Sequence, residues 1–242
     1  MPSLPRAILF DMDDTILAVS GSARVVWARI AEEFAAAIAP LSPAAVVAAI
    51  DARSQVLWSD AAWNRAWRVR VREARRNIVA SAFASLSAAD GVMPVPGVGD
   101  AMADRFTSIR DEELSLFPGA HETLDRLRRL GVRLALITNG AAEPQRAKVV
   151  RFALAERFDH VQIEGEHGFG KPEERAYTHA MAALGVGPQD TWMIGDNLEW
   201  EIRAPQRLGI YAIWYDGYAS GLPPNCPVRP DRIIRSLPEL LT

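Results

Sequence analysis

The sequence predicts an α/β protein in which a parallel sheet flanked by helices is interrupted by one long helical segment. Three observations support this fold class. A short apolar run near the N-terminus stops abruptly at acidic residues. The next hundred residues are rich in Ala and Arg and show helical spacing. In the second half, strand and helix patterns alternate, as a parallel sheet requires. The length of 242 residues suits a core domain that carries an insert.

The first predicted strand covers residues 7–10, with the sequence Ala-Ile-Leu-Phe. A four-residue apolar run that ends at acids is typical of a buried strand leading into a polar loop. Asp11 and Asp13 therefore lie at the carboxyl end of this strand. In open α/β sheets, ligands bind at that end of the strands.

The segment from residue 20 to about 110 is predicted to be entirely helical. Apolar residues recur at steps of four and form one stripe, made of Val26, Ile30, Phe34 and Ile38. Further helices are expected at 43–58, 61–86 and 100–114. The Gly- and Pro-rich residues 90–99 indicate a loop. We find no convincing strand pattern in this segment, so we expect an all-helical insert.

The second half supplies the remaining strands of the predicted sheet. Apolar or alternating runs predict strands at residues 132–138, 161–164, 191–194 and 210–214. Helical patterns separate these runs, and one of the helices ends at Gly131, a common C-terminal cap. Pro205 lies inside the helical pattern that follows residue 196, where we expect it to kink or shorten the helix.

Composition excludes several classes of protein. The net charge of -3 and the pI near 5.9 do not resemble the basic surface of a nucleic-acid binder. No apolar run approaches the roughly 18 residues of a membrane span, and the first residues lack the pattern of a secretory signal. The single cysteine, Cys226, excludes an internal disulfide. We therefore expect a cytoplasmic protein, either a monomer or a homodimer, without nucleic-acid or membrane partners.

Polar side chains follow three of the predicted strands. They are Asp11 and Asp13, Thr138 and Asn139, and Asp196 and Asn197. Parallel strands place their carboxyl ends at one edge of the sheet, so these groups are expected to converge. Lys171, in the loop Gly168-Phe-Gly-Lys-Pro, is a further candidate.

This set of side chains is suited to phosphoryl transfer. Clustered carboxylates repel one another unless some are protonated or a cation lies between them. Mg²⁺ binds hard oxygen ligands, commonly one or two carboxylates together with substrate phosphate. The hydroxyl of Thr138 and the charge of Lys171 could hold the phosphate. A carboxylate such as Asp11 could attack phosphorus and form an aspartyl-phosphate.

Four motifs in order resemble those of the haloacid dehalogenase (HAD) superfamily of hydrolases. Asp11-Met-Asp13-Asp-Thr15 resembles the family's DxDxT, and Thr138 follows a hydrophobic strand as in its second motif. Gly170-Lys171-Pro172 resembles the lysine motif. The run from Gly195 to Glu201 resembles GDxxxxD, with Glu in place of the last Asp. The helical insert resembles the family's helical cap.

The resemblance implies a role for each acid that matches a motif. Asp11 would be the nucleophile and a magnesium ligand. Asp13 would be the general acid/base and would bind magnesium through its backbone carbonyl. Asp196 would bind magnesium directly.

The resemblance also assigns the groups around these acids. Thr138 and Asn139 would hold the phosphate, and Lys171 would neutralise charge. Glu201 is one methylene longer than the usual Asp, so we expect it to act indirectly, through water or Lys171.

We therefore expect a Rossmann-like core of residues 1–17 and 113–242, with a helical cap at 18–112. The expected activity is Mg²⁺-dependent hydrolysis of a small phosphorylated metabolite through an aspartyl-phosphate. The long cap and the 195–201 run resemble the branch that contains flavin mononucleotide and nucleotide phosphatases.

Three alternatives to a phosphatase stay open. A 2-haloacid dehalogenase would use the same Asp11 on carbon without metal, although Asp13 argues against it. A sugar phosphomutase would retain the phosphate. A non-enzymatic binding protein could also use the same fold.

Two clusters allow more than one interpretation. Trp58, Trp63 and Trp67, with the arginines between residues 65 and 76, could form a substrate-binding wall or a packed stripe beside a solvated basic face. The second set is the histidines, which show no metal-ligand spacing; they are His121, His160, His167 and His179. We expect surface or core roles for them.

Overall fold

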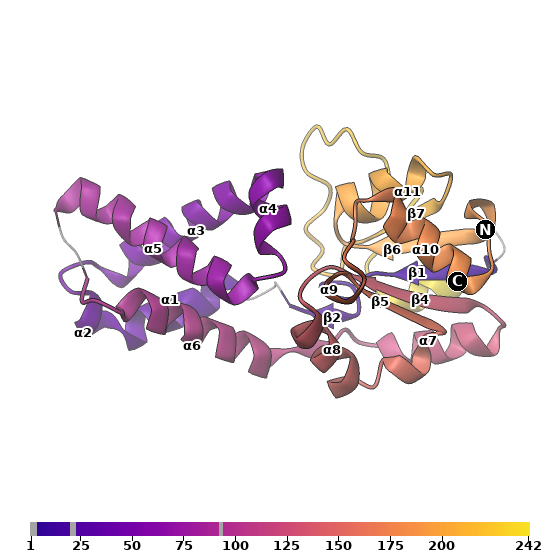
Figure 1. Cartoon of the computed structure of the whole chain (residues 1–242), viewed down its shortest axis with the longest axis horizontal. Helices are drawn as coiled ribbons and strands as arrows, with labels where there is room; N and C mark the ends of the chain where they lie inside the picture. The colour runs from indigo at the N-terminus through magenta and orange to yellow at the C-terminus, as the bar shows by residue number, and fades with distance from the viewer. Residues whose placement is uncertain (1–3, 20–22, 92–93) are drawn as a thin grey trace. The chain divides into compact units, whose positions relative to one another are not determined.

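The computed structural model describes residues 4–19, 23–91 and 94–242 (Figure 1). Residues 1–3, at the start of the predicted core, lie outside the described residues. So do residues 20–22, at the start of the predicted helical segment, and Val92 and Met93 in the predicted loop 90–99. The chain forms two compact units: an α/β unit of residues 1–19 and 115–242, and a helical unit of residues 20–114.

The α/β unit is built on a six-stranded sheet in which all neighbouring strands run parallel, in the order β5-β4-β1-β6-β7-β8. The strands are β1 (Ala7–Phe10), β4 (Arg133–Thr138), β5 (His160–Ile163), β6 (Thr191–Gly195), β7 (Tyr211–Tyr215) and β8 (Arg232–Ile234). The first five match the predicted strands. The edge strand β8 was not predicted, because three residues carry too little pattern to indicate a strand.

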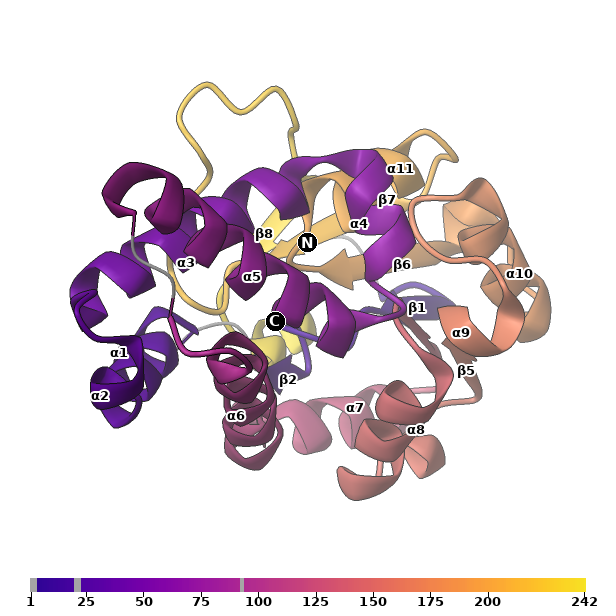
Figure 2. The same cartoon turned by 60° about the vertical axis from the view of Figure 1, so that its left-hand side comes forward.

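Helices cover both faces of this sheet. They are α7 (Ala120–Arg129), α8 (Ala142–Arg151), α10 (Glu174–Leu184) and the short α11 (Ala204–Gln206). Ile8 and Phe10 of β1 pack in one core with α7 and α8, whereas Ala7 and Leu9 pack in another with α10 and α11. Figures 1 and 2 show α7 and α8 on one side of the strands and α10 on the other. Because strand side chains alternate in direction, both faces of β1 must be apolar, as its sequence is.

A two-stranded antiparallel pair marks where the chain leaves and re-enters the α/β unit. It consists of β2 (Leu17–Ala18) and β3 (Ser115–Leu116), with Ala18 opposite Ser115. Both strands are part of the α/β unit, whose first segment ends at residue 19 and whose second begins at residue 115, each two residues later than the sequence analysis placed it. A two-residue pairing leaves no recognisable pattern in the sequence.

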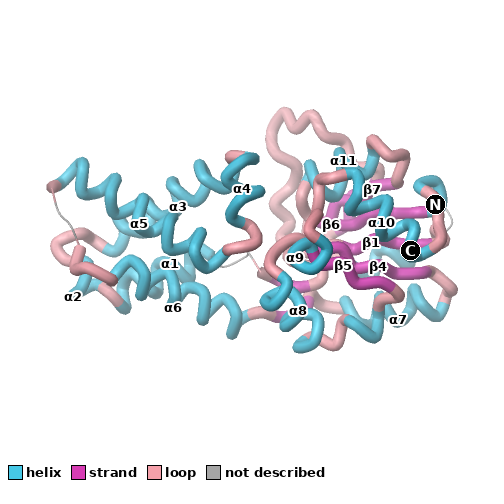
Figure 3. Tube along the Cα trace, viewed as in Figure 1, coloured by secondary structure: helices cyan, strands magenta, loops and turns pink. Residues whose placement is uncertain are grey.

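The helical unit contains α1 (Ala23–Glu33), α2 (Ala35–Ile38), α3 (Pro43–Ser59), α4 (Ala61–Trp67), α5 (Val71–Asp90) and α6 (Val98–Glu113). Among its described residues there is no strand (Figure 3). The prediction of one helix over 61–86 is wrong, because the backbone leaves the helical region at Arg70 and α5 starts anew. No helix within the described parts of the chain is long and apolar enough to cross a bilayer.

The helical unit has a core of its own. Val26, Ile30 and Ile38 of the predicted stripe are buried in it. Trp27 of α1 stacks on Phe106 of α6, with ring centroids 4.1 Å apart. The unit therefore does not depend on the sheet for its apolar packing.

The tryptophan cluster of the helical unit packs on itself. Trp63 lies edge-on to Trp58, with ring centroids 4.6 Å apart, and is stacked near Trp67. Trp58 and Trp63 also pack against the helical core. Among the nearby arginines, Arg76 pairs with Asp104 of α6. The three tryptophans are partly buried and contact one another, as a packed stripe requires, and the role of their exposed parts stays a prediction.

Candidate active site

The turn after β1 places Asp11 at the carboxyl edge of the sheet. The backbone N–H of Asp11 donates to the carbonyl of Ile194 at 2.9 Å, which continues the β1–β6 ladder. The chain then turns so tightly that the Met12 carbonyl accepts from the N–H groups of Ile16 and Leu17. Asp14 takes the left-handed conformation, with φ of 59°, which aspartate tolerates better than most residues. These hydrogen bonds fix the main chain at Asp11, and the Thr15 hydroxyl donates to Asp11 Oδ2 at 3.1 Å.

Lys171 forms a buried ion-pair network with two carboxylates. Its Nζ lies 2.5 Å from Asp11 Oδ1 and 2.8 Å from Glu201 Oε1, and its side chain is 1% exposed. Burial alone would lower the pKa of Lys171, but the charges of Asp11 and Glu201 outweigh burial and raise the pKa. The ammonium is therefore charged at neutral pH and stands beside the carboxylate that follows β1.

Glu201 reaches Lys171 from a π-helical turn, η3 (Leu198–Arg203). The side chain of Asn197 accepts from the N–H groups of Glu199 and Trp200, both at 3.0 Å, and so caps this turn. Glu201 Oε2 accepts from the N–H of Asn197 at 2.9 Å. The extra methylene of Glu relative to Asp is accommodated at this turn, and the carboxylate contacts Lys171 directly. After η3, the helix with Pro205 in its first turn ends at Gln206, which matches the shortening expected from proline.

Asp13 is held by two side chains of α8 that the sequence analysis missed. Lys148 Nζ lies 2.8 Å from both Asp13 carboxylate oxygens. Gln145 Nε2 lies 2.9 Å from Asp13 Oδ2 and 2.7 Å from Thr138 Oγ1. The spacing of three residues puts Gln145 and Lys148 on one face of α8. The one feature of the sequence that could have indicated Lys148 is the scarcity of lysine, since Lys148 is the only lysine besides Lys171.

Asn139 joins the end of β4 to the segment that carries Lys171. Its Nδ2 donates to the Lys171 carbonyl at 2.7 Å, and its Oδ1 accepts from the Lys171 N–H at 2.9 Å. Thr138, one residue earlier, is buried at the end of the strand. The Asn139 side chain therefore positions the segment that carries the lysine. The Thr138 hydroxyl lies next to the Asn139 carbonyl and accepts from the Gln145 side-chain amide.

Asp196 follows β6, the strand next to β1, so its carboxyl group lies at the same edge of the sheet as that of Asp11. Burial, followed by the charges of Asp11 and Glu201, raises the pKa of Asp196 to about 9. Burial also raises the pKa of Glu201 to about 7 and raises that of Asp11. Three carboxylates thus share the positive charge of one lysine, and they resist ionising together.

This donor set fits a divalent cation. Carboxylate oxygens on adjacent strand ends are hard ligands of the kind that Mg²⁺ prefers. A doubly charged ion would balance the excess negative charge that raises these pKa values. Asp11 and Asp196 would hold the ion. The backbone carbonyl of Asp13, assigned as a ligand by the sequence resemblance, belongs to the same turn.

Comparison with curated proteins identifies several phosphatases as relatives. The chain is 40% identical over 126 residues to the phosphoserine phosphatase of Thermus thermophilus, a match that covers 52% of this chain and 49% of that protein. It is 32% identical to the glyceraldehyde 3-phosphate phosphatase of Pyrococcus furiosus, over 57% of this chain and 55% of that protein. The matches thus span about half the length of these two relatives. The glyceraldehyde 3-phosphate phosphatase of Methanopyrus kandleri is 28% identical over 86% of this chain and 82% of that protein.

Solved structures share the whole fold. The magnesium-bound HAD-hydrolase YfnB from Bacillus subtilis superposes with a TM-score of 0.70 at 24% identity, covering 98% of this chain and 97% of that one. The L-2-haloacid dehalogenase from Xanthobacter autotrophicus gives a TM-score of 0.61 at 19% identity, covering 98% and 97% of the two chains. A family model of haloacid dehalogenase-like hydrolases matches residues 5–209. This match spans most of the chain, including all four motifs, and shows that the protein belongs to the haloacid dehalogenase-like hydrolase family.

Proposed function

We propose that this protein is a Mg²⁺-dependent phosphatase that hydrolyses small phosphorylated metabolites through a phosphorylated Asp11. The observation that carries the proposal is the arrangement around Asp11. The Asp11 carboxylate is buried and lies 2.5 Å from the Lys171 ammonium. Asp11 follows β1 and Asp196 follows the adjacent strand β6, so both acids lie at the same edge of the sheet. The relatives named phosphatases support the same reaction class, since their names specify phosphoserine and glyceraldehyde 3-phosphate.

In the first step, a carboxylate oxygen of Asp11 attacks phosphorus and the bond from phosphorus to the leaving oxygen breaks. Asp13 donates the proton that this leaving oxygen needs. Lys148 and Gln145 fix the Asp13 carboxyl group through contacts of 2.8 and 2.9 Å. Lys171 remains charged and stabilises the negative charge that develops on the transferred group.

In the second step, water attacks the phosphorus of the aspartyl-phosphate and the bond to Asp11 breaks. Asp13 accepts the proton of this water, so it returns to its starting state with the release of inorganic phosphate. Thr138 would hold a phosphate oxygen through its hydroxyl, and Asn139 through its backbone N–H. A Mg²⁺ ion held by Asp11 and Asp196 would supply further positive charge to the phosphoryl group.

The same carboxylate could in principle displace halide from carbon. The position of Asp13 argues against this alternative, because an acid held by two polar side chains serves to transfer a proton to a leaving oxygen, and a halide ion needs none. Flavin and nucleotide monophosphates remain part of the proposed substrate range, together with smaller phosphate esters.

The test is a screen of purified protein against a panel of substrates, with Mg²⁺ or with chelator. The panel contains phosphoserine, glyceraldehyde 3-phosphate, flavin mononucleotide, nucleoside monophosphates, sugar phosphates and 2-chloropropionate. We expect phosphate release that requires Mg²⁺ and falls to background in the Asp11→Asn variant. The matched control is Asp190→Asn, an exposed residue paired with Arg6, which should keep full activity.

Three outcomes would contradict the proposal. Chloride release that is insensitive to chelator would indicate a dehalogenase. Isomer formation without phosphate release would indicate a phosphomutase. Full phosphatase activity in Asp11→Asn would exclude Asp11 as the nucleophile.

A further inference from the structure

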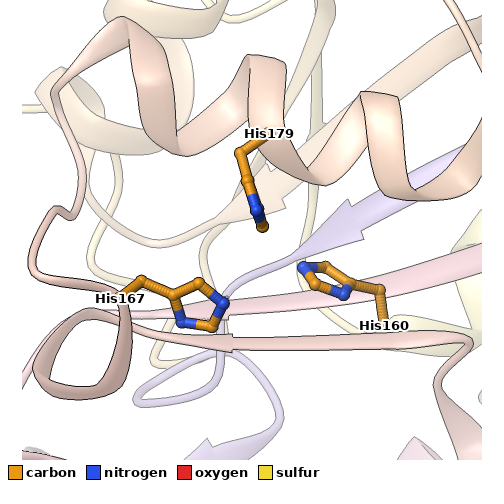
Figure 4. A group of neighbouring side chains, drawn as sticks. All are labelled: His160, His167 and His179. Carbon is orange, nitrogen blue, oxygen red and sulfur yellow. The ribbon is translucent and has the colours of Figure 1, made fainter.

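Three histidines whose spacing along the chain shows no metal-ligand pattern come together in space (Figure 4). His160 starts β5, His167 ends the short helix α9 (Glu164–His167), and His179 lies in α10. One ring nitrogen from each lies within 4.8 Å of the others. All three side chains are partly buried, and they point toward one another. The sequence analysis expected surface or core roles for these residues, because spacing along the chain does not reveal that they meet.

Hydrogen bonds to the other ring nitrogens orient two of the three side chains. His179 Nδ1 lies 2.8 Å from the side-chain oxygen of Gln162, and His167 Nδ1 lies 3.1 Å from the carbonyl of Ile163. The Gln162 amide is itself oriented, because its nitrogen donates to the Ala176 carbonyl at 2.9 Å. Both acceptors are oxygens, so both Nδ1 atoms carry the proton and both Nε2 lone pairs remain available for a ligand.

The third histidine contributes a polar atom that needs a partner. His160 Nε2 is buried, and none of the described residues offers it a hydrogen bond. A buried nitrogen without a partner is costly, and it commonly marks the place of an ion or water. The cluster thus combines two oriented imidazoles with one buried nitrogen that has no hydrogen-bond partner among the described residues.

We propose that His160, His167 and His179 bind a divalent transition-metal ion of the Zn²⁺ type. Imidazole nitrogen is a ligand that Zn²⁺, Ni²⁺ and Cu²⁺ accept, whereas Mg²⁺ and Ca²⁺ require oxygen. Ligating histidines usually donate their second N–H to a carbonyl or carboxylate, which is the arrangement of His167 and His179. This site is distinct from the carboxylates at the carboxyl edge of β1 and β6.

The geometry requires a small inward movement of the rings. Nitrogen ligands about 2.0–2.1 Å from a tetrahedral Zn²⁺ lie about 3.3 Å from one another. The present separations of up to 4.8 Å would therefore shrink by at most about 1.5 Å, a change that side-chain torsions can supply. Three protein ligands leave one position for water or a small anion.

The location of the cluster indicates a structural role. Only three residues separate His167 from Lys171, and Phe169 between them packs against the rings of His167 and His179. Glu164, at the other end of α9, accepts from the N–H of Gly140 at 3.0 Å. A metal ion would therefore link β5, α9 and α10, the three elements that flank the segment carrying Lys171, and stabilise that segment.

The direct test is calorimetric titration of the untagged full chain with ZnCl₂ in saturating Mg²⁺, together with Co²⁺ as a spectroscopic probe. We expect one Zn²⁺ per chain, a raised melting temperature, and visible absorption bands of tetrahedral Co²⁺. The variants His167→Gln and His179→Gln should each abolish this binding. His121→Gln is the matched control, since His121 instead contacts the carbonyl of Phe152.

A second set of variants separates this site from the carboxylate site and from loss of folding. Gln162→Leu removes the acceptor of His179 Nδ1 and should weaken Zn²⁺ binding about 10- to 100-fold without removing a ligand. Asp11→Asn should leave Zn²⁺ binding unchanged. Circular dichroism checks that each variant is folded. Zn²⁺ binding that survives in both folded histidine variants, that is lost in Asp11→Asn, or that is absent from the wild type would overturn the proposal.

Discussion

The chain contains two lysines beside 25 arginines, and both lysines contact acids of the candidate active site. Lys171 could be identified from the sequence because a motif surrounds it. Lys148 could not, because a lysine near the end of a helix is normally a solvent-exposed residue. Its partner Asp13 is 135 residues away, and only the fold brings α8 beside the turn after β1.

Gln145 was missed for the same reason, although it contacts three polar groups of the site. Its amide nitrogen lies 2.9 Å from Asp13 Oδ2, 2.7 Å from Thr138 Oγ1 and 2.9 Å from the Asn139 carbonyl. One side chain thus links the acid that follows β1 to the end of β4.

We expect Gln145→Leu to lower kcat/KM for the best phosphate ester about 100-fold, because misplacement of a reacting group by about 1 Å costs this much. The matched control, Gln206→Leu, removes an amide that contacts Arg229 and Asp231 away from these acids, and it should keep full activity. Steady-state kinetics at saturating Mg²⁺ measures both. Equal activity of Gln145→Leu and wild type would show that Gln145 does not position the acid.

At the scale of elements, the strands that carry the candidate site could be predicted, and the irregular elements could not. The runs ending at Asp11, Thr138 and Asp196 are apolar on both faces, which is the strongest signal that a parallel sheet leaves in a sequence. The break between α4 and α5 depends on local backbone geometry at Arg70, within a continuous helical pattern. The histidine cluster depends on the packing of β5, α9 and α10, which spacing along the chain does not reveal.

The π-helical turn η3 requires a glycine at the end of β6. A Cβ atom added to Gly195 would collide with the side chain of Glu201, so only glycine leaves room for that carboxylate to reach Lys171. Close approach of a side chain, rather than a special backbone angle, thus explains this glycine.

We expect Gly195→Ala to destabilise the fold by about 2 kcal/mol, which is a typical cost of forcing extra volume into a packed site. Gly187→Ala is the control, since an added Cβ meets no atom within 4 Å there, and its free energy of unfolding should change by less than about 0.5 kcal/mol. Urea denaturation in the presence of chelator measures both variants. Similar stabilities for the two variants would contradict the role assigned to the Gly195–Glu201 contact.

At the scale of the whole molecule, the chain consists of two units with separate apolar cores. The insert was recognisable because its composition and its helical spacing differ from those of the flanking sequence. The insert was expected at 18–112 and the compact helical unit spans 20–114; the β2–β3 pairing that closes the α/β unit involves only two residues of each strand and leaves no signal in the sequence.

This closure predicts that the α/β unit folds without the helical unit. Residues 19–114 can be replaced by Asn-Gly, since Ala18 and Ser115 are already paired and a two-residue turn of this type joins antiparallel strands. We expect a folded monomer that unfolds in one transition and whose Mg²⁺ affinity equals that measured for the full chain, because Asp11 and Asp196, the proposed ligands, belong to this unit. Amide NMR spectra and calorimetry check these points. A disordered shortened chain would show that the helical unit is required for folding.

The position of β1 at the centre of the sheet also affects the order of events during synthesis. This strand leaves the ribosome before its neighbours β4 and β6, which begin only at Arg133 and Thr191. The contiguous helical unit is therefore fully translated while β1 still has no partner. We infer that the nascent chain folds its helices first, and that sheet formation, which depends on contacts of high sequence separation, is the slower and more aggregation-sensitive stage.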